Sequence, residues 1–241
     1  FGILLTLTDG TAVPGTYGIG DTGGTGFDTF GALETFKNIN VVRGSNNADV
    51  INGNSFFNQF EGMKGNDTID GNGGSDRINY FNETRFHTNV EPILGVVVNL
   101  SNVAVTIGAT NYAAHTGTDT WGGTDLLLDI EEVFATNLGD TIYGNEFDNK
   151  FFTLDGNDTI YLGDGFDYVE AGGGSDYIDG SASAGMDQTY ADRDEISYDD
   201  FIGVNGVGIY VDLNSNTFID PTGAIDTAID IERVRGMPRR Q

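Results

Sequence analysis

A spacing of nine residues runs through two parts of the chain and restricts the folds that it can form. An Asp or Asn recurs at this spacing, at Asp49, Asn58, Asp67 and Asp76, and again at Asp140, Asn149, Asp158, Asp167 and Asp176. Two positions after each of them stands an apolar residue: Ile51, Phe60, Ile69, Ile78, Ile142, Phe151, Ile160, Val169 and Ile178. A short fixed period of this kind is typical of coiled repeat architectures.

The nonapeptide can be interpreted from the space that each of its parts needs. The three residues around each apolar position are too few for a helical turn, but they suit a short strand with one inward side chain. Glycines in the other six residues permit positive φ angles and close backbone approach. Two loop–strand pairs then form a coil of about eighteen residues that stacks on the next coil. This predicts an all-β stack with a narrow apolar core.

A longer period encloses the nonapeptides. A shift of 91 places "GFDTF" (26–30) on "GTDTW" (117–121) and "DVINGN" (49–54) on "DTIYGN" (140–145). Strand-like segments begin at Gly2, Gly95 and Gly208. Each unit therefore has a β-rich segment, which we call a β-header, followed by nonapeptides. We expect a section of a longer protein with these segments: β-header 1–43, β-roll 44–80, linker and second β-header 81–134, second β-roll with its tail 135–200, and a third β-header 201–241 that belongs to a truncated unit.

Composition limits the partners and the chemistry. With 37 acidic and 11 basic side chains, the formal charge of −26 disfavours nucleic acid and favours cations or basic surfaces. The absence of cysteine excludes disulfides, zinc–thiolate sites and cysteine nucleophiles. No apolar run approaches the length of a membrane span.

Stacking places the loop carboxylates above one another at two edges. One edge carries Asp49 over Asp67, and Asp140 over Asp158 over Asp176, while the other carries Asn58 over Asp76 and Asn149 over Asp167. Stacked carboxylates repel one another without a counter-ion, and irregular clusters of hard oxygen atoms suit calcium better than magnesium. The sequence therefore predicts calcium. Sites against Asn58 and Asn149 are expected to be weaker or empty, because each lacks one formal charge.

The loop sequences resemble a known family. The segments "GMKGND", "GNGGSD", "TLDGND", "LGDGFD" and "AGGGSD" are similar to the G-G-x-G-x-D-x-U-x repeat of RTX (repeats-in-toxin), haemolysin-type calcium-binding proteins. The β-header sequence "GTDTWGGTDLLLDIEEV" also resembles segments that precede such repeats in large secreted bacterial proteins. The resemblance implies an all-β fold, with a right-handed parallel β-roll of calcium-binding nonapeptides interleaved with β-headers.

The resemblance also implies where the ions bind. Each calcium ion would lie between loops eighteen residues apart, held by Asp side chains and loop carbonyls. The best pair is 153–158 with 171–176, followed by 44–49 with 62–67 and by 135–140 with 153–158. Asp155 and Asp164 hold the third loop position, where the side chain either adds a ligand or faces water. The full expected metal-site set is Asp49, Gly62, Lys64, Gly65, Asp67, Gly71, Gly73, Asp76, Asp140, Thr153, Asp155, Gly156, Asp158, Leu162, Asp164, Gly165, Asp167, Ala171, Gly173, Gly174 and Asp176.

Four loops depart from the family pattern. The segments "GSNNAD", "GNSFFN", "ATNLGD" and "GNEFDN" lack internal glycines or replace Asp by Asn. A series of solvated turns without metal is the simpler alternative for all the loops, but turns alone require neither a fixed spacing nor stacked carboxylates.

Other motifs are weaker. The segment "DLNSNTFID" begins like an EF-hand loop, but Thr217 and Gly223 stand where a glycine and a glutamate are needed, so a hairpin turn is favoured. The segment "GIGDTG" (18–23) matches a dinucleotide-binding pattern without the helix that must follow it. His87 and His115 form no zinc motif, and "SASAG" (181–185) misses the nucleophile elbow. No catalytic residues and no enzyme activity are predicted for this section.

Two functional hypotheses remain. The first is a calcium-binding, secreted structural module of a bacterial surface layer, adhesin or other extracellular scaffold. The second is a non-catalytic RTX appendage of a secreted enzyme or toxin that assists export and folding. Recurrence of a unit made of β-header and roll favours the first. The expected partners are calcium ions, with neighbouring copies or cell-surface components as further candidates, and the expected location is extracellular or at the bacterial cell surface.

Overall fold

The computed structural model describes residues 2–8, 23–27, 33–37, 39–85, 93–181, 193–198 and 208–236. Within these ranges the protein is built from short strands, and the only helical element is the 3₁₀ turn η1 (Glu83–Arg85). The chain divides into two compact units, residues 1–94 with 115–132, and residues 95–114 with 133–241. His87 and nearly all of "GIGDTG" and "SASAG" lie outside the described residues.

Unit 1 contains two layers of strands. The first layer has the order β3-β2-β1-β5-β7-β13-β12, with bounds β1 (Leu4–Thr8), β2 (Gly23–Phe27), β3 (Leu33–Lys37), β5 (Val50–Asn52), β7 (Thr68–Asp70), β12 (Thr116–Thr118) and β13 (Thr124–Leu128). The second layer has the order β8-β6-β4, with bounds β4 (Val41–Arg43), β6 (Gln59–Glu61) and β8 (Arg77–Asn79). Strands β1, β5, β7 and β13 are parallel, as are β4, β6 and β8.

Unit 2 repeats this arrangement with more coils. Its first layer has the order β21-β22-β23-β19-β17-β15-β9, with bounds β9 (Val97–Asn99), β15 (Thr141–Tyr143), β17 (Thr159–Tyr161), β19 (Tyr177–Asp179), β21 (Tyr210–Asp212), β22 (Thr217–Ile219) and β23 (Ile225–Ile229). Its second layer runs β24-β20-β18-β16-β14, with bounds β14 (Glu132–Phe134), β16 (Lys150–Phe152), β18 (Tyr168–Glu170), β20 (Glu195–Ser197) and β24 (Arg233–Arg235). β10 (Val105–Ile107) and β11 (Thr110–Tyr112) form a separate hairpin.

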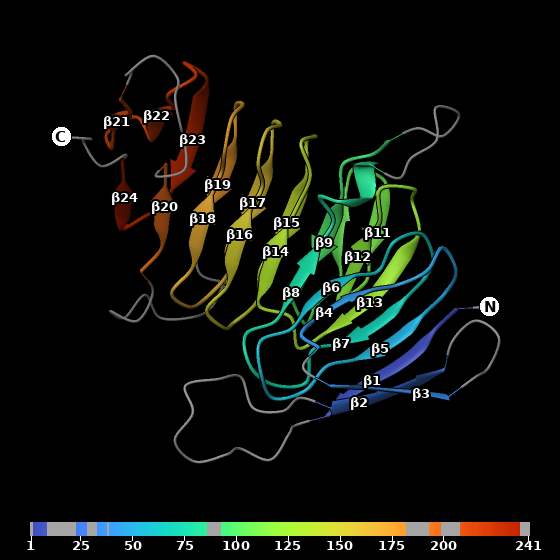
Figure 1. The fold of residues 1–241 in the computed structure, drawn as a ribbon. Coiled ribbons are helices and arrows are strands. Elements are labelled where there is room, and N and C mark those ends of the chain that lie inside the picture. Colours follow the sequence, from blue (N-terminus) through green and yellow to red (C-terminus); the bar gives the residue numbers. More distant parts are fainter. Residues whose placement is uncertain are drawn as a thin grey trace, which may run out of the picture. The chain divides into compact units, whose positions relative to one another are not determined.

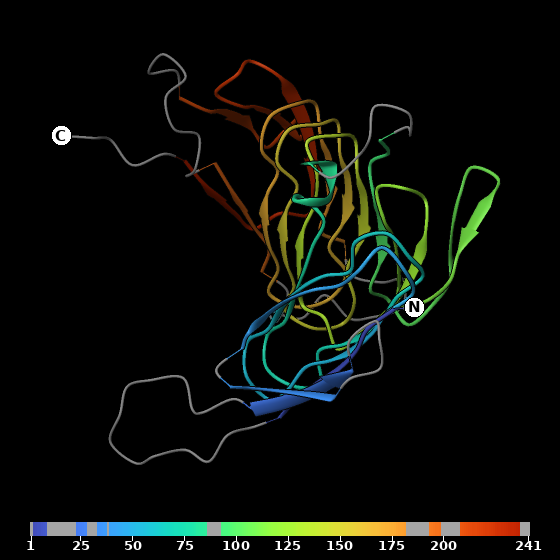
Figure 2. The same ribbon diagram turned by 45° about the vertical axis from the view of Figure 1, so that its right-hand side comes forward.

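Successive strands of unit 2 lie side by side in Figure 1. In Figure 2 its yellow and orange coils overlap, because the view runs more nearly along the stack. Pairing partners are eighteen residues apart, as in Ile142↔Ile160 and Ile160↔Ile178. The parallel β-roll is therefore confirmed, with two nonapeptides in each coil.

The apolar residues of the repeat form the core between the two layers. All nine that follow the repeating Asp or Asn have no exposed surface: Ile51, Phe60, Ile69, Ile78, Ile142, Phe151, Ile160, Val169 and Ile178. Their strand neighbours are mostly half-buried, since side chains alternate between the two faces of a strand. The prediction that these residues point inward is confirmed.

Strands of the β-headers extend the same column of core residues at both ends of each stack. In unit 1, Leu5 of β1 pairs with Ile51, and Leu127 of β13 pairs with Ile69. In unit 2, Val98 of β9 pairs with Ile142, and Ala228 of β23 pairs with Ile178. The β-header strands from Gly2 and Gly95 thus cap the rolls.

The strand that follows Gly208 behaves differently. It becomes β21, which pairs antiparallel with β22, with Asp212 opposite Thr217. This hairpin occupies the segment that begins like an EF-hand loop, so the hairpin interpretation is confirmed.

The inward column makes a quantitative prediction for Ile160→Ala. Removing a fully buried Ile side chain leaves a cavity and is expected to lower the free energy of unfolding by about 2–5 kcal/mol. Urea unfolding of the calcium-saturated protein measures this loss. Thr159→Ala on the outward face of the same strand is the control, with a loss well under half as large. Equal losses would contradict the assignment of the core.

Candidate metal centre

The repeating Asp side chains link each coil to the coil before it. In each case the Oδ1 atom accepts a hydrogen bond from the main-chain N–H of the residue eighteen positions earlier. The nitrogen–oxygen distances are 2.8 Å for Asp49 to Asp67, 2.6 Å for Asn58 to Asp76, 2.8 Å for Asp140 to Asp158, 2.6 Å for Asn149 to Asp167, and 2.9 Å for Asp158 to Asp176. This bond connects the loops of successive coils. The carboxylates that accept it are buried.

The second oxygen of several of these carboxylates has no donor. The Oδ2 atoms of Asp67, Asp76, Asp158 and Asp176 are buried and accept no hydrogen bond. These side chains are at most 3% exposed. A buried charged oxygen without a partner costs several kcal/mol. A hard cation between the loops would remove that cost, so the donor set fits calcium.

Main-chain oxygens surround the same space. A Cβ atom at Gly44 would stand 2.5 Å from the carbonyl oxygen of Gly62, and one at Gly174 would collide with that of Gly156. Only glycine permits such an approach. Among the described residues, no three His, Cys, Asp or Glu side chains cluster to hold a metal. Each site would therefore combine a pair of carboxylates with loop carbonyls.

Burial changes the electrostatics of these groups. Desolvation by burial, together with the charges of Asp140 and Asp176, raises the pKa of Asp158 to about 8. Desolvation likewise raises the pKa values of Asp67, Asp76 and Asp176 to about 7. Hydrogen bonds from the preceding coil oppose the shift in each case. Without a cation, these carboxyl groups keep their protons to a pH well above the ordinary range of Asp.

In the first Asp-containing loop of each roll, the Asp side chain accepts hydrogen bonds from a residue of the same loop. Asp49 accepts hydrogen bonds from the main-chain N–H of Ser45 at 2.6 Å and from its hydroxyl at 2.9 Å. Asp140 accepts the equivalent pair from Thr136, both at 2.9 Å. In these loops a main-chain N–H and the hydroxyl group of the same residue supply the donors that stabilise the carboxylate.

The loops at the other edge close in the same manner with amide groups. Asn58 accepts the N–H of Asn54 at 2.9 Å, and Asn149 accepts that of Asn145 at 2.9 Å. We call 44–49, 53–58, 135–140 and 144–149 the self-closed loops. They are the four segments that depart from the family pattern.

The remaining nonapeptide loops, 62–67, 71–76, 153–158, 162–167 and 171–176, we call open loops. Their second residue has a left-handed backbone even where it is not glycine, with φ of 68° at Met63, 66° at Asn72 and 71° at Leu154. Such a conformation costs about 1–3 kcal/mol for a non-glycine residue. Strain of this kind commonly marks a binding loop.

The structure places the predicted site residues in two groups. The repeating Asp residues and the first loop positions are buried: Asp49, Asp67, Asp76, Asp140, Asp158, Asp167, Asp176, Gly62, Gly71, Thr153, Leu162 and Ala171. The third and fourth positions lie nearer the rim, half-buried except for exposed Asp155 and buried Gly173: Lys64, Gly65, Gly73, Asp155, Gly156, Asp164, Gly165, Gly173 and Gly174.

Loops 153–158 and 171–176 are joined by main-chain and side-chain hydrogen bonds. Gly173 donates to the Leu154 carbonyl at 2.9 Å, and Gly156 donates to the Gly173 carbonyl at 2.7 Å. The Thr153 hydroxyl donates to the Ala171 carbonyl at 2.9 Å. This is the pair ranked first from the sequence, and its calcium site stays a prediction.

Sequence reasoning missed the carboxylates that end each column. Asp125 accepts the N–H of Asp67 at 2.9 Å, and Asp226 accepts that of Asp176 at 3.0 Å. At the other edge, Glu131 and Glu232 accept the N–H groups of Asp76 and Asp194. The Asp-x-apolar pattern at Asp125–Leu127 and Asp226–Ala228 could have revealed the first two, although the nine-residue spacing is broken there.

Comparison with protein families agrees with this geometry. The family model for the RTX calcium-binding nonapeptide repeat, which spans four copies, matches residues 43–78, 134–169 and 152–184. The two stacks are RTX repeats. The matches cover the RTX loops and their strands but leave most of each β-header unmatched. No curated protein matches the chain. None of the helices in the described residues has the length and apolar character to cross a membrane.

The buried Oδ2 atom of Asp158, which has no hydrogen-bond donor, leads to a prediction for Asp158→Asn. Replacing this buried carboxylate removes a charge from the space between two open loops, so calcium affinity should fall by about tenfold or more. Calorimetric titration measures the change. Asp155→Asn is the matched control, because it makes the same substitution at an exposed position of the same loop. A larger loss of affinity in Asp155→Asn than in Asp158→Asn would show that Asp155, and not Asp158, is the ligand.

The raised pKa values predict an unusual pH dependence without calcium. Unfolded carboxyl groups lose their protons near pH 4, whereas these groups hold them to about pH 7–8 when folded. The folded form therefore binds more protons between these values, and its stability in chelator should fall as the pH rises from about 5 to 8. The calcium-induced rise in Tm should grow over the same interval.

Thermal unfolding at several pH values, with chelator and with calcium, tests this dependence. Asp158→Asn should show a shallower slope in chelator, which separates the local carboxyl group from the general repulsion of an acidic chain. Greater stability at pH 8 than at pH 5 in chelator would contradict the prediction.

Proposed function

We propose that the chain is a calcium-dependent structural module of a secreted or cell-surface bacterial protein. The chain is a calcium-binding RTX module, and RTX repeats are typically found in secreted bacterial proteins and are not in general catalytic. The observation that carries the proposal is the set of buried carboxylate oxygens without donors in the open loops, at Asp67, Asp76, Asp158 and Asp176. Such a set is stable when positive charge lies between the coils.

In the proposed switch, calcium binding changes the chain from an expanded to a folded state. Each residue type contributes one part of it. The Oδ1 atoms hold successive coils in register, and the Oδ2 atoms with the loop carbonyls provide the cation sites. Calcium supplies the positive charge that offsets the repulsion of stacked carboxylates in a chain of net charge −26. Because no preformed site exists in an unfolded chain, binding free energy becomes folding free energy.

The calcium level of the surroundings would then control folding. Extracellular modules bind calcium with dissociation constants of about 10⁻⁴ to 10⁻³ M. A chain with sites of this strength stays expanded inside a cell and folds outside it. The β-headers, which cap both stacks, give the folded rolls defined ends and form the scaffold with them.

The alternative role, as an appendage of a secreted enzyme or toxin, uses the same calcium chemistry. The complete reading frame distinguishes the two roles. A catalytic domain in the same polypeptide favours the appendage, and further units made of β-header and roll favour the scaffold.

The proposed switch predicts a large structural change on addition of calcium. At about pH 8, where the buried carboxyl groups lose their protons, circular dichroism and small-angle scattering should show an expanded, strand-poor chain in chelator and a compact, strand-rich chain in millimolar calcium. Magnesium at the same concentration is the control, because its stricter octahedral preference suits these loops poorly. A chain that is already compact in chelator, with a Tm that calcium leaves unchanged, would refute the proposal.

A further inference from the structure

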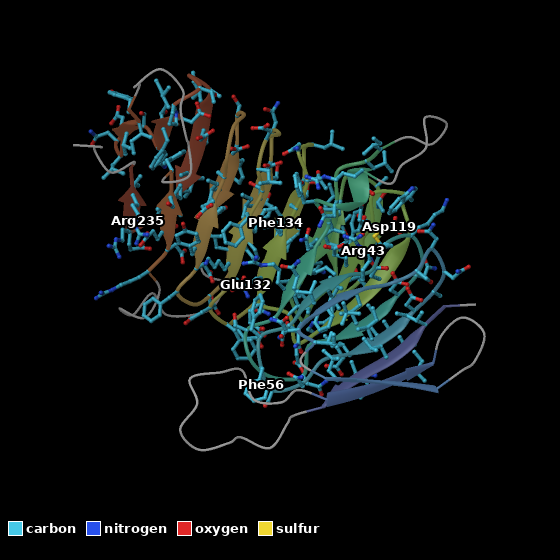
Figure 3. The ribbon with its side chains drawn as sticks, in the orientation of Figure 1. Arg43, Phe56, Asp119, Glu132, Phe134 and Arg235 are labelled. Atoms are coloured by element: carbon cyan, nitrogen blue, oxygen red, sulfur yellow. The ribbon has the colours of Figure 1, made fainter. Side chains whose placement is uncertain are left out.

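In unit 1, the loop that stacks on open loop 62–67 from the carboxyl-terminal side lies outside the nonapeptides. It comprises residues 119–125 and joins β12 to β13, and we call it the closing loop of unit 1. Asp119 is labelled on this hairpin in Figure 3. Its Oδ2 accepts the N–H of Gly65 at 3.1 Å, while its Oδ1 accepts the N–H groups of Trp121 and Gly123 at 2.8 and 2.7 Å. Asp119 therefore fastens the closing loop onto open loop 62–67.

Two oxygens on opposite sides of this junction lack donors. Asp67 of the open loop and Asp125 of the closing loop are 2% and 0% exposed, and neither Oδ2 atom accepts a hydrogen bond. A Cβ atom at Gly123 would collide with the carbonyl oxygen of Gly65. The junction therefore combines two carboxylate oxygens without donors, one in each loop, with a main-chain carbonyl in close contact with the opposite loop.

A third buried carboxylate adjoins the junction. The Oε2 atom of Glu83 accepts both the N–H and the hydroxyl of Thr120 at 3.1 Å, so η1 is attached to the closing loop. Glu83 is completely buried, and its Oε1 atom has no hydrogen-bond donor. Burial, together with the charge of Asp119, raises the pKa values of Glu83 and Asp125 to about 9 and 8.

The equivalent loop of unit 2, residues 220–226, meets its need without a cation. Asp226 accepts the N–H of Asp176 as Asp125 accepts that of Asp67, but its Oδ2 also accepts the hydroxyl of Tyr198 at 2.8 Å. In unit 1 the corresponding hydroxyl of Tyr80 lies close enough to Asp125 to lower its pKa but does not reach hydrogen-bond geometry. The same hairpin is closed by a tyrosine in one unit and left open in the other.

We infer that the closing loop of unit 1 forms a further calcium site with open loop 62–67, in which Asp67 and Asp125 are the carboxylate pair and Glu83 contributes additional negative charge. This inference rests on the proposed calcium-binding function and adds a site that the nonapeptide pattern does not contain. The site joins the roll to the β-header strand that follows it, so calcium also holds the end of this stack.

The position of the only tryptophan allows a specific test. Trp121 lies in the closing loop, four residues before Asp125, and the chain contains no other tryptophan. Terbium, a hard trivalent probe of calcium sites, emits when a nearby aromatic ring transfers excitation energy to it. Excitation at a wavelength that tryptophan absorbs and tyrosine does not therefore reports terbium in the closing loop.

The full chain is titrated with terbium and then with excess calcium. We expect tryptophan-sensitised emission that calcium reverses and that falls several-fold in Asp125→Asn and in Glu83→Gln. Asp226→Asn, the matched change in unit 2, should leave the emission unchanged. Glu83→Gln keeps the size of the side chain and decides the question if Asp125→Asn fails to fold.

The inference is overturned by three results. These are the absence of tryptophan-sensitised emission in the unaltered chain, emission that calcium does not displace, or emission that neither Asp125→Asn nor Glu83→Gln reduces. If calcium still raises the Tm while this emission is absent, only the closing-loop site is lost. If calcium changes neither circular dichroism nor Tm, the proposed function fails with it.

Discussion

The fold depends on the different roles of the two carboxylate oxygens of each repeating Asp. One oxygen accepts the N–H of the preceding coil, as in the 2.8 Å bond from Asp140 to Asp158, and thereby sets the vertical register of the stack. That bond draws the carboxylate out of water and leaves its other oxygen buried without a donor. The interaction that orders the coils therefore also creates the need for a cation.

The apolar core is narrow and contributes little stability to offset the cost of the buried carboxylates. Each three-residue strand buries one side chain, so a coil contributes two residues such as Phe151 and Ile160. Ordering the long glycine-containing loops opposes folding through the loss of backbone entropy. Metal binding is the route by which small domains with little core commonly gain stability.

The sequence predicted the repeating part of the structure well because its spacing is fixed by geometry. Ile51, Ile69 and their counterparts must point inward once the nine-residue period is recognised, and all of them do. Asp125 and Asp226 were missed because they lie 58 and 50 positions after Asp67 and Asp176, so no local period connects them to these residues. Glu83 was missed because its partner, Thr120, is distant in the sequence.

The self-closed loops also show what the sequence revealed only in part. Departures from the glycine and Asp positions of the family pattern marked these four segments as different, but they did not show what replaces that pattern. The structure supplies the answer in hydrogen bonds such as those from Ser45 to Asp49 and from Thr136 to Asp140. A donor four residues before the carboxylate is a local feature that a later sequence comparison can use.

The location of the self-closed loops gives each stack a direction. They form the first coil of each roll, and in the two that contain Asp, Ser45 and Thr136 donate hydrogen bonds to Asp49 and Asp140. In both stacks the N–H groups of one coil donate to the Asp residues of the next, so these hydrogen bonds all point from the amino-terminal coil toward the carboxyl-terminal one. The amino-terminal end of each stack therefore carries loops that close on their own donors, whereas the following coils carry Oδ2 atoms without donors.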